Sequence, residues 1–115
     1  DRETMRRTAR WVWDNWEWPR TWGWDYPMLA MTAARVGEPE LALDALLLDV
    51  TKNTYLANGH NYQSSRLPLY LPGNGGLLTA VAMMAAGWDA APDRDAPGFP
   101  AEGWTVRWEG LRRMP

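Results

Sequence analysis

The feature that most limits the fold of this chain is the run GGLLTAVAMMAAGW at residues 75–88, which is apolar on nearly every side. Asn74 is a candidate N-cap and Gly87 a candidate stop, so one helix is expected between them. A helix that is apolar nearly all round has to be buried by several neighbours. Because three other helices cannot supply enough neighbours, we expect the chain to be a piece of a larger helical array.

Three further helices are predicted from the spacing of apolar residues and from Pro and Gly residues at the expected helix ends. Apolar side chains recur at steps of three and four over residues 2–16. A second helix is expected from Asp25, as its N-cap, to Gly37, a residue type that suits the left-handed end of a helix. A third helix is expected to begin at Glu38 and to end near residue 50. The second and third helices would form an antiparallel hairpin with a short joint.

The C-terminal part has a different pattern. Residues 88–100 are rich in Pro and Asp, which favours a loop, and residues 105–112 (TVRWEGLR) alternate apolar and charged side chains as a strand does. The predicted fold class is therefore mainly α, with antiparallel helix pairs and a short C-terminal β segment. We expect residues 1–88 to form a partial helical domain, and residues 89–115 to form a loop and the start of a β-rich segment.

Composition argues against several classes of function. The chain has no Cys and one His, which excludes disulfides and argues against a metal site, and no motif indicates a cofactor. Its 12 basic and 14 acidic residues are scattered, so no nucleic-acid partner is expected. No apolar run approaches the ~20 residues that span a bilayer, so no membrane partner is expected. The compartment is unknown, because no segment indicates one.

Tryptophan is concentrated in one short stretch. Six of the nine tryptophans lie between Trp11 and Trp24, interleaved with Asp14, Glu17 and Asp25. The apolar face of a pyranose packs on an indole plane, while neighbouring carboxylates and amides bond its hydroxyls. The first hypothesis is therefore a sugar site. The structural alternative is that these indoles are core and groove residues of an amphipathic helix.

Residues 52–74 have no helical period and are rich in amide, imidazole and phenol groups. Long loops in compact domains tend to be functional, so we expect this loop and the turn at residues 22–26 to face a substrate on a shared cavity. His60 would bond sugar hydroxyls or transfer a proton, or alternatively would hold the loop through a backbone carbonyl. The candidate substrate-binding residues are Trp22, Trp24, Asn58, His60, Asn61, Tyr62, Gln63, Tyr70 and Asn74.

Hydrolysis of a glycosidic bond normally uses two carboxylates, one as acid and one as base or nucleophile. Asp14, Glu17 and Asp25 lie among the indoles, where apolar walls could raise the pKa of a carboxyl group. Asp25 is the candidate catalytic residue of the three, and helix capping is its structural alternative. Glu17 has the alternative of a solvated helix residue.

Two segments resemble a known family. The run GNGGLLTAVAMMAAGW, preceded by LPLYLP and followed by FPAEGWTVRWEGLR, resembles the closing part of the (α/α)6 catalytic barrel of glycoside hydrolase family 95, the α-L-fucosidases. The segment WDYPMLAMTAARVGEPELALDALL resembles a helix pair of that barrel. The resemblance implies that residues 1–88 belong to a toroid catalytic domain. It also implies an oligosaccharide or glycoside substrate, and the remainder of a parent chain as partner.

Some residues of this chain match the functional residues of the family, and others do not. Gly73, Asn74 and Gly76 match the Gly-Asn-x-Gly turn of the family. The Asp that precedes this turn in the family, and acts as or with the base, is Pro72 here. The general-acid Glu of the family would lie upstream of Asp1. The departure at Pro72 implies a toroid hydrolase with a differently placed base, or one that has lost activity.

Three functions remain open from the sequence. The first is a fragment of a glycoside hydrolase that cleaves O-glycosidic bonds by carboxylate acid–base chemistry, inactive by itself. The second is a carbohydrate-binding or scaffold module without catalysis, which the missing base and the abundant aromatics favour. The third is a helical-repeat domain that binds another protein.

Overall fold

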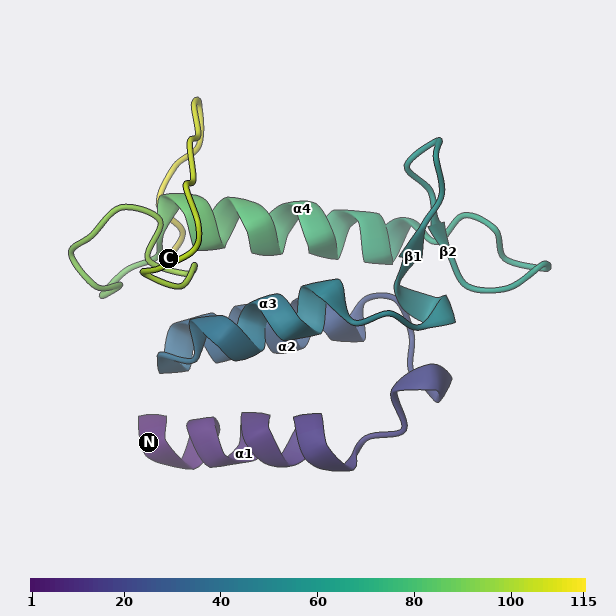
Figure 1. Ribbon diagram of the computed structural model, residues 1–115, viewed down its shortest axis with the longest axis horizontal. Helices are drawn as coiled ribbons and strands as arrows, with labels where there is room; N and C mark the ends of the chain where they lie inside the picture. The colour runs from purple at the N-terminus through teal and green to yellow at the C-terminus, as the bar shows by residue number, and fades with distance from the viewer.

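The computed structural model describes residues 1–115, and it confirms the predicted mainly α class. The four α-helices are α1 (Arg2–Asn15), α2 (Asp25–Val36), α3 (Pro39–Leu47) and α4 (Leu71–Ala86) (Figure 1). Short 3-10 turns occupy Trp18–Arg20 and Thr51–Asn53, and the only sheet is an antiparallel pair, β1 (Thr54–Tyr55) and β2 (Asn61–Tyr62). Thr54 pairs with Tyr62, and Tyr55 pairs with Asn61.

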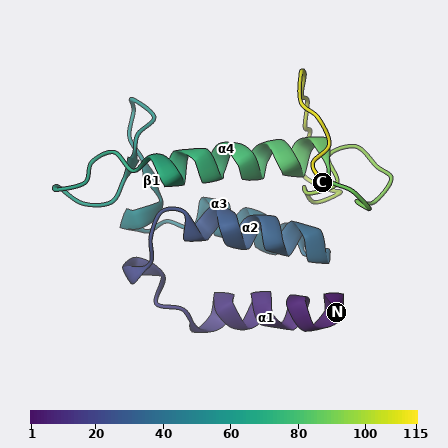
Figure 2. The same ribbon diagram turned by 180° about the vertical axis from the view of Figure 1, so that it is seen from behind.

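The helices stack in layers. Figures 1 and 2 show α1 on one side, α2 with α3 in the middle, and α4 on the other side. Successive helices run in opposite directions, so α2 and α4 both begin at the end where the β-hairpin lies. The two chain termini lie at the opposite end. Helix α2 is the central element, because it contacts α1, α3 and α4.

Small side chains allow the close packing around α2. Ala30 and Ala33 of α2 and Ala42 of α3 are completely buried, and Met83 and Met84 of α4 fill the space beside them. Alanine costs no side-chain entropy and lets two helices approach, whereas methionine adapts its shape to irregular gaps. The predicted hairpin of α2 and α3 is confirmed. Its joint is made by Gly37, whose φ of 87° is the left-handed conformation expected there.

Both predicted N-caps are corrected. Helix α4 begins at Leu71, where Pro72 needs no N–H, and the Tyr70 carbonyl accepts the N–H groups of Gly73 and Asn74. The Asn74 side chain is therefore within the first turn and bonds to the hairpin. Asp25 is the first residue of α2, and its carboxylate accepts a hydrogen bond from the backbone of the preceding turn instead of capping α2 itself.

The predicted C-terminal strand is wrong. Residues 105–112 form no strand and have no partner strand, the chain bends at Gly110, and most of their side chains are exposed. An alternating pattern forms a strand only where a neighbour can complete the hydrogen bonds. The tail is held elsewhere, because Trp88 and Met114 form an isolated bridge and Gly98 donates its N–H to the Met84 carbonyl at 2.9 Å.

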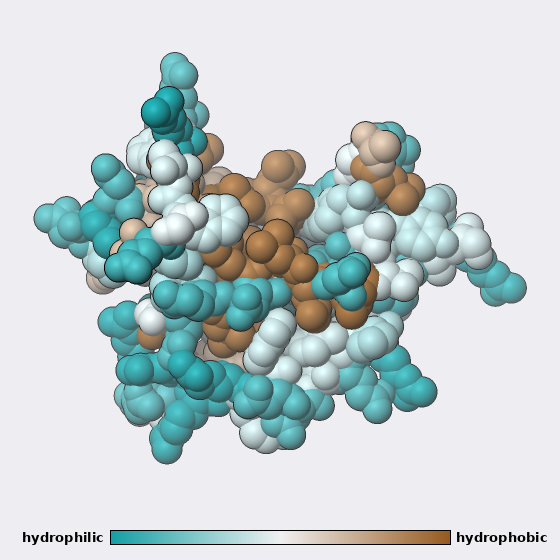
Figure 3. All heavy atoms as spheres, viewed as in Figure 1, coloured by the Kyte–Doolittle hydropathy of each residue, from teal (hydrophilic) through white to brown (hydrophobic).

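Helix α4 is buried on one side only. Leu78 is 72% exposed, and Leu71 and Val81 are also exposed. Figure 3 shows an apolar area near the middle of the molecule, and a hollow of about 500 Å³ lies beside α3 and α4. A membrane crossing would need a longer apolar helix than any that the chain forms. The residues that line the hollow are Leu43, Leu46, Leu47, Tyr55, Leu77, Val81, Phe99 and Trp104.

Candidate functional site

The indole-rich bend and the amide-rich loop meet at one end of the helices, as predicted, but none of the main hollows of the structure is lined by residues 22–26, so the predicted shared cavity is not found among them. The backbone N–H of Gly23 donates to Oε1 of Gln63 at 2.8 Å, across 40 residues of sequence. The rings of Trp22 and Tyr70 lie 5.6 Å apart, centroid to centroid, with a tilt of 30° between their planes. Because α2 and α4 both begin at this end, the turn before each helix is brought to the same place (Figure 1).

Two buried amides hold the segments together. Asn61 is 0% exposed and Gln63 is 2% exposed. Nδ2 of Asn61 donates to the carbonyls of Lys52 (3.2 Å) and Thr54 (3.1 Å). Nε2 of Gln63 donates to the same Lys52 carbonyl (2.8 Å) and to Oδ1 of Asn61 (3.0 Å). The predicted contact of these two amides with a ligand is therefore corrected, since their hydrogen bonds are used within the chain to position its surface.

Two glycines make this packing possible. A Cβ on Gly23 would lie 2.0 Å from Oδ1 of Asn61, and a Cβ on Gly73 would lie 1.9 Å from the same atom. Neither distance is compatible with van der Waals contact, so both backbones approach the amide more closely than any other residue would permit. Gly73 belongs to the turn that the sequence singles out, whereas the role of Gly23 was missed. The only feature of the sequence that marks Gly23 is its position between Trp22 and Trp24.

The exposed surface above the amides is an aromatic rim, defined here as Trp22, Trp24, Asp25, Lys52 and Tyr70. Trp22 is 47% exposed, and Nζ of Lys52 lies 4.5 Å from the centroid of its ring. Lys52 and Tyr70 thus both contact the Trp22 ring. Trp24 is 53% exposed and makes no ring–ring or cation–ring contact, so its indole is the free aromatic surface. Sequence reasoning missed Lys52, a cation at the start of a loop rich in amides.

Asp25 is the half-buried carboxylate of the rim. Its Oδ2 accepts the backbone N–H of Trp22 at 2.8 Å, which fixes the bend before α2. Burial raises the pKa of the Tyr70 hydroxyl, and the negative charge of Asp25 raises it further. Asp25 thus binds the backbone of Trp22, whose ring packs on that of Tyr70. A carboxylate and a phenol beside an exposed indole form the kind of group that bonds sugar hydroxyls.

The remaining predicted residues lie in the β-hairpin, except Asn74, which belongs to the first turn of α4. Oδ1 of Asn74 accepts the backbone N–H of Asn61 at 3.0 Å, and Nδ2 of Asn74 donates to the Gly59 carbonyl at 2.7 Å, so Asn74 ties α4 to the hairpin. Asn58 is exposed in the hairpin turn, where its Oδ1 accepts the backbone N–H of His60. The imidazole of His60 is half-buried and makes no hydrogen bond within the chain, and Tyr62 is half-buried.

Part of the tryptophan cluster belongs to the core, as the structural alternative expected. Trp18 is buried, donates from Nε1 to the Trp13 carbonyl at 2.9 Å, and packs against Trp13 and Trp16. Its own carbonyl accepts the hydroxyl proton of Tyr26 at 2.7 Å, and burial raises the pKa of that hydroxyl. Tyr26 is completely buried on α2, so these contacts anchor the bend to the central helix. Only the last two indoles of the run reach the rim.

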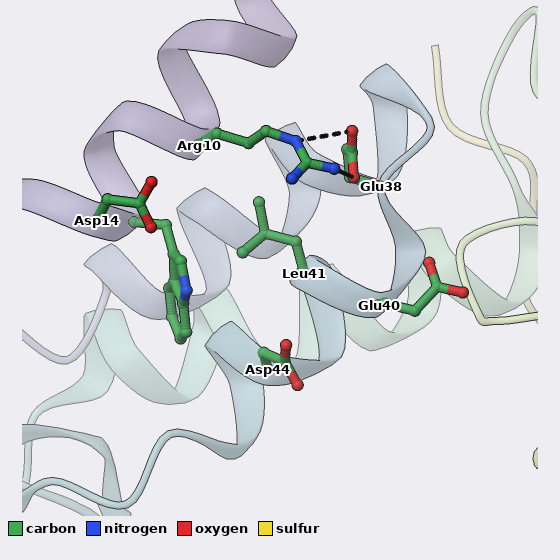
Figure 4. Close-up of a pocket in the computed structure, with 7 residues that line it drawn as sticks. Arg10, Asp14, Glu38, Glu40, Leu41 and Asp44 are labelled. Atoms are coloured by element: carbon green, nitrogen blue, oxygen red, sulfur yellow. Dashed lines mark hydrogen bonds and ion pairs between the residues drawn. The ribbon is translucent and has the colours of Figure 1, made fainter.

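A polar hollow lies between α1 and α3 and has a volume of about 320 Å³ (Figure 4). Nε of Arg10 donates to Oε1 of Glu38 at 3.1 Å, and Nη2 of Arg10 donates to Oε2 of Glu38 at 2.5 Å. The hydrogen bonds to Glu38 and its negative charge raise the pKa of Arg10. Figure 4 shows Asp14, Glu40 and Asp44 spaced around the hollow. Asp14 thus lines a different surface from Asp25. Glu17 is exposed and pairs with Arg20 at 3.1 Å, as a solvated residue does.

No three of the His, Asp and Glu side chains are placed to hold a metal ion. Comparisons of the chain with known protein families, with curated proteins and with solved structures found no match.

Proposed function

We propose that this chain is part of a carbohydrate-active protein and that the aromatic rim binds sugar. The observation that carries the proposal is the convergence of Trp22, Tyr70 and Lys52 above a buried amide network, with Trp24 exposed two residues further along the chain from Trp22. Sugars bind where an aromatic plane lies beside hydroxyl, amide and carboxylate groups. The rim and the adjoining hairpin supply all of these groups.

The proposed parent protein is a glycoside hydrolase of the (α/α)6-toroid type. The resemblance of two segments to that architecture supports this proposal. So do two features of the fold: α2 and α4 run parallel to each other, and the exposed apolar side of α4 needs further helices to cover it. In this proposal Asp25 is the acid or base at the rim, and the partner carboxylate comes from another part of the parent chain.

Replacing Asp25 with Asn in the full-length parent is expected to reduce turnover by about 100-fold or more, because general acid–base catalysis contributes about that much. The fold should remain, since the amide oxygen can still accept the Trp22 N–H. Rates on a chromogenic glycoside, with circular dichroism as the folding control, measure both effects. Turnover equal to that of the unmodified parent would remove Asp25 from the catalytic role.

Replacing Trp24 with Ala is expected to weaken oligosaccharide binding by about tenfold or more, because stacking on an aromatic face contributes about 1–3 kcal/mol. Trp24 is exposed, so its loss should not affect folding. Trp11 on α1 is the matched control, because it is 59% exposed and lies outside the rim. Tryptophan fluorescence during titration with neutral and acidic oligosaccharides measures binding. Equal losses in both variants, or no binding by the unmodified chain, would contradict the proposal.

The alternative is a carbohydrate-binding or scaffold module that does not catalyse. Pro72 in place of the family's Asp, and an Asp25 carboxylate already engaged by the Trp22 amide, favour it. The two functions differ in one result: binding of oligosaccharide by the parent, without release of product over long incubation, supports the module and contradicts the hydrolase.

A further inference from the structure

Lys52 stands out on the aromatic rim as an ammonium group without a carboxylate partner. The four ion pairs of the structure join Glu3, Glu17 and Glu38 to arginines, and none involves Lys52. Asp25 is the acidic residue of the rim, and its Oδ2 accepts a hydrogen bond from the backbone N–H of Trp22. The charge of Lys52 therefore faces an aromatic ring and solvent, where it is free to pair with an incoming anion.

The position of Lys52 is built into the fold. Its backbone carbonyl accepts hydrogen bonds from both buried amides, Asn61 at 3.2 Å and Gln63 at 2.8 Å. Gln63 also binds the N–H of Gly23, next to Trp22. One buried network thus sets the backbone of Lys52 and the backbone of the indole that its ammonium covers, at 4.5 Å from the ring centroid. A cation held in this way has lost part of its freedom before a ligand arrives, which favours binding.

We propose that the rim recognises a negatively charged sugar, in which a carboxylate or a sulfate ester pairs with Lys52 while the sugar ring packs against Trp24. This inference rests on the proposed sugar binding. A neutral sugar hydroxyl would accept one hydrogen bond from the ammonium, whereas a carboxylate or sulfate adds the Coulomb attraction of an opposite charge to that bond. The arrangement also accounts for Trp22, whose ring supports the cation instead of offering a free face.

The test compares charged and neutral forms of the same sugars. The whole chain is titrated with an α-1,4-linked galacturonate tetramer and its methyl ester, and with a sulfated galactan oligomer and its desulfated form. At least one charged form is expected to bind about tenfold more tightly than its neutral partner, because hydrogen bonds to charged groups contribute more than neutral ones. The preference should decrease as salt is added, since exposed charges are screened. A preference for the galacturonate over its methyl ester identifies a carboxylate as the group that is bound, and a preference for the sulfated galactan over its desulfated form identifies a sulfate.

Two variants assign the preference to Lys52. Lys52→Met should abolish it, and Lys52→Arg should retain it, because arginine keeps the charge. Both should fold normally, since the buried network uses only the backbone carbonyl of Lys52. Equal binding of charged and neutral forms, or a preference that survives in Lys52→Met, overturns the inference and leaves the proposed function standing. No binding of any of these sugars overturns the inference, and failure with the whole oligosaccharide panel overturns the proposed function as well.

Discussion

Replacing Gly73 with Ala is expected to destabilise the protein by about 3 kcal/mol, because the added methyl group overpacks a closed site and displaces a buried amide. The new Cβ would lie 1.9 Å from Oδ1 and 2.6 Å from Cγ of Asn61. Asn61 cannot yield cheaply, because its side chain bonds Lys52, Thr54 and Gln63. Urea unfolding followed by circular dichroism measures the loss as a lower midpoint.

Gly75 provides the matched control for this substitution. It lies in the same helix, two residues further on, and a Cβ there meets no atom within 4 Å. Gly75→Ala should therefore stabilise the protein by about 0.5–1 kcal/mol, since alanine is the better helix former. The double variant Gly73→Ala with Asn61→Ala should lose less than the sum of the two single losses, because removal of the amide relieves the clash. Equal stabilities of the two glycine variants would contradict the close approach.

Replacing Gln63 with Met is expected to cost about 3 kcal/mol of stability and to weaken the proposed binding of sugar at the rim. Methionine has a similar shape, but it leaves the buried N–H of Gly23 without an acceptor and removes one donor from the Lys52 carbonyl. The bend before α2 then loses its link to the loop. The same unfolding measurement and the oligosaccharide titration give the two effects.

Asn58→Leu is the control for the loss of an amide in the same segment. Asn58 is exposed and makes a single hydrogen bond, to the backbone of His60, so its replacement should change stability by less than about 1 kcal/mol. If Gln63→Met is as mild as Asn58→Leu, the buried amides do not hold the two segments together. The rim would then depend on the helices alone.

The helices were predictable because they rest on local signals. Apolar spacing located α1 to within a residue, and Gly37 and Gly87 marked the ends of α2 and α4 correctly. The predicted start of α4 was four residues too late, because Tyr70 and Pro72 supply a first turn ahead of the glycines. The tail at residues 105–112 was misread as a strand, because alternation of side chains does not provide the neighbour that a strand requires.

The sugar-binding candidates divide according to burial. The predicted residues Trp22, Trp24 and Tyr70 lie at the rim, whereas Asn61 and Gln63 lie beneath it. An exposed amide that bonds a ligand and a buried amide that bonds the backbone have the same residue type, so composition does not distinguish them. Lys52 was missed for a related reason. Its proposed role depends on the contact of its ammonium group with the Trp22 ring, and no local sequence pattern predicts that contact.

The amino-acid sequence alone determined which segments are helical, where the long loop lies, and that indoles and amides are concentrated in two segments. These properties depend on residues that are near one another along the chain. Only the tertiary structure decided which polar groups are buried, which indole is free, and which cation stands over a ring. Those properties arise from contacts such as that of Gly23 with Gln63, 40 residues apart, whose hydrogen bond exists only after α2 and α4 have packed with their first turns at one end.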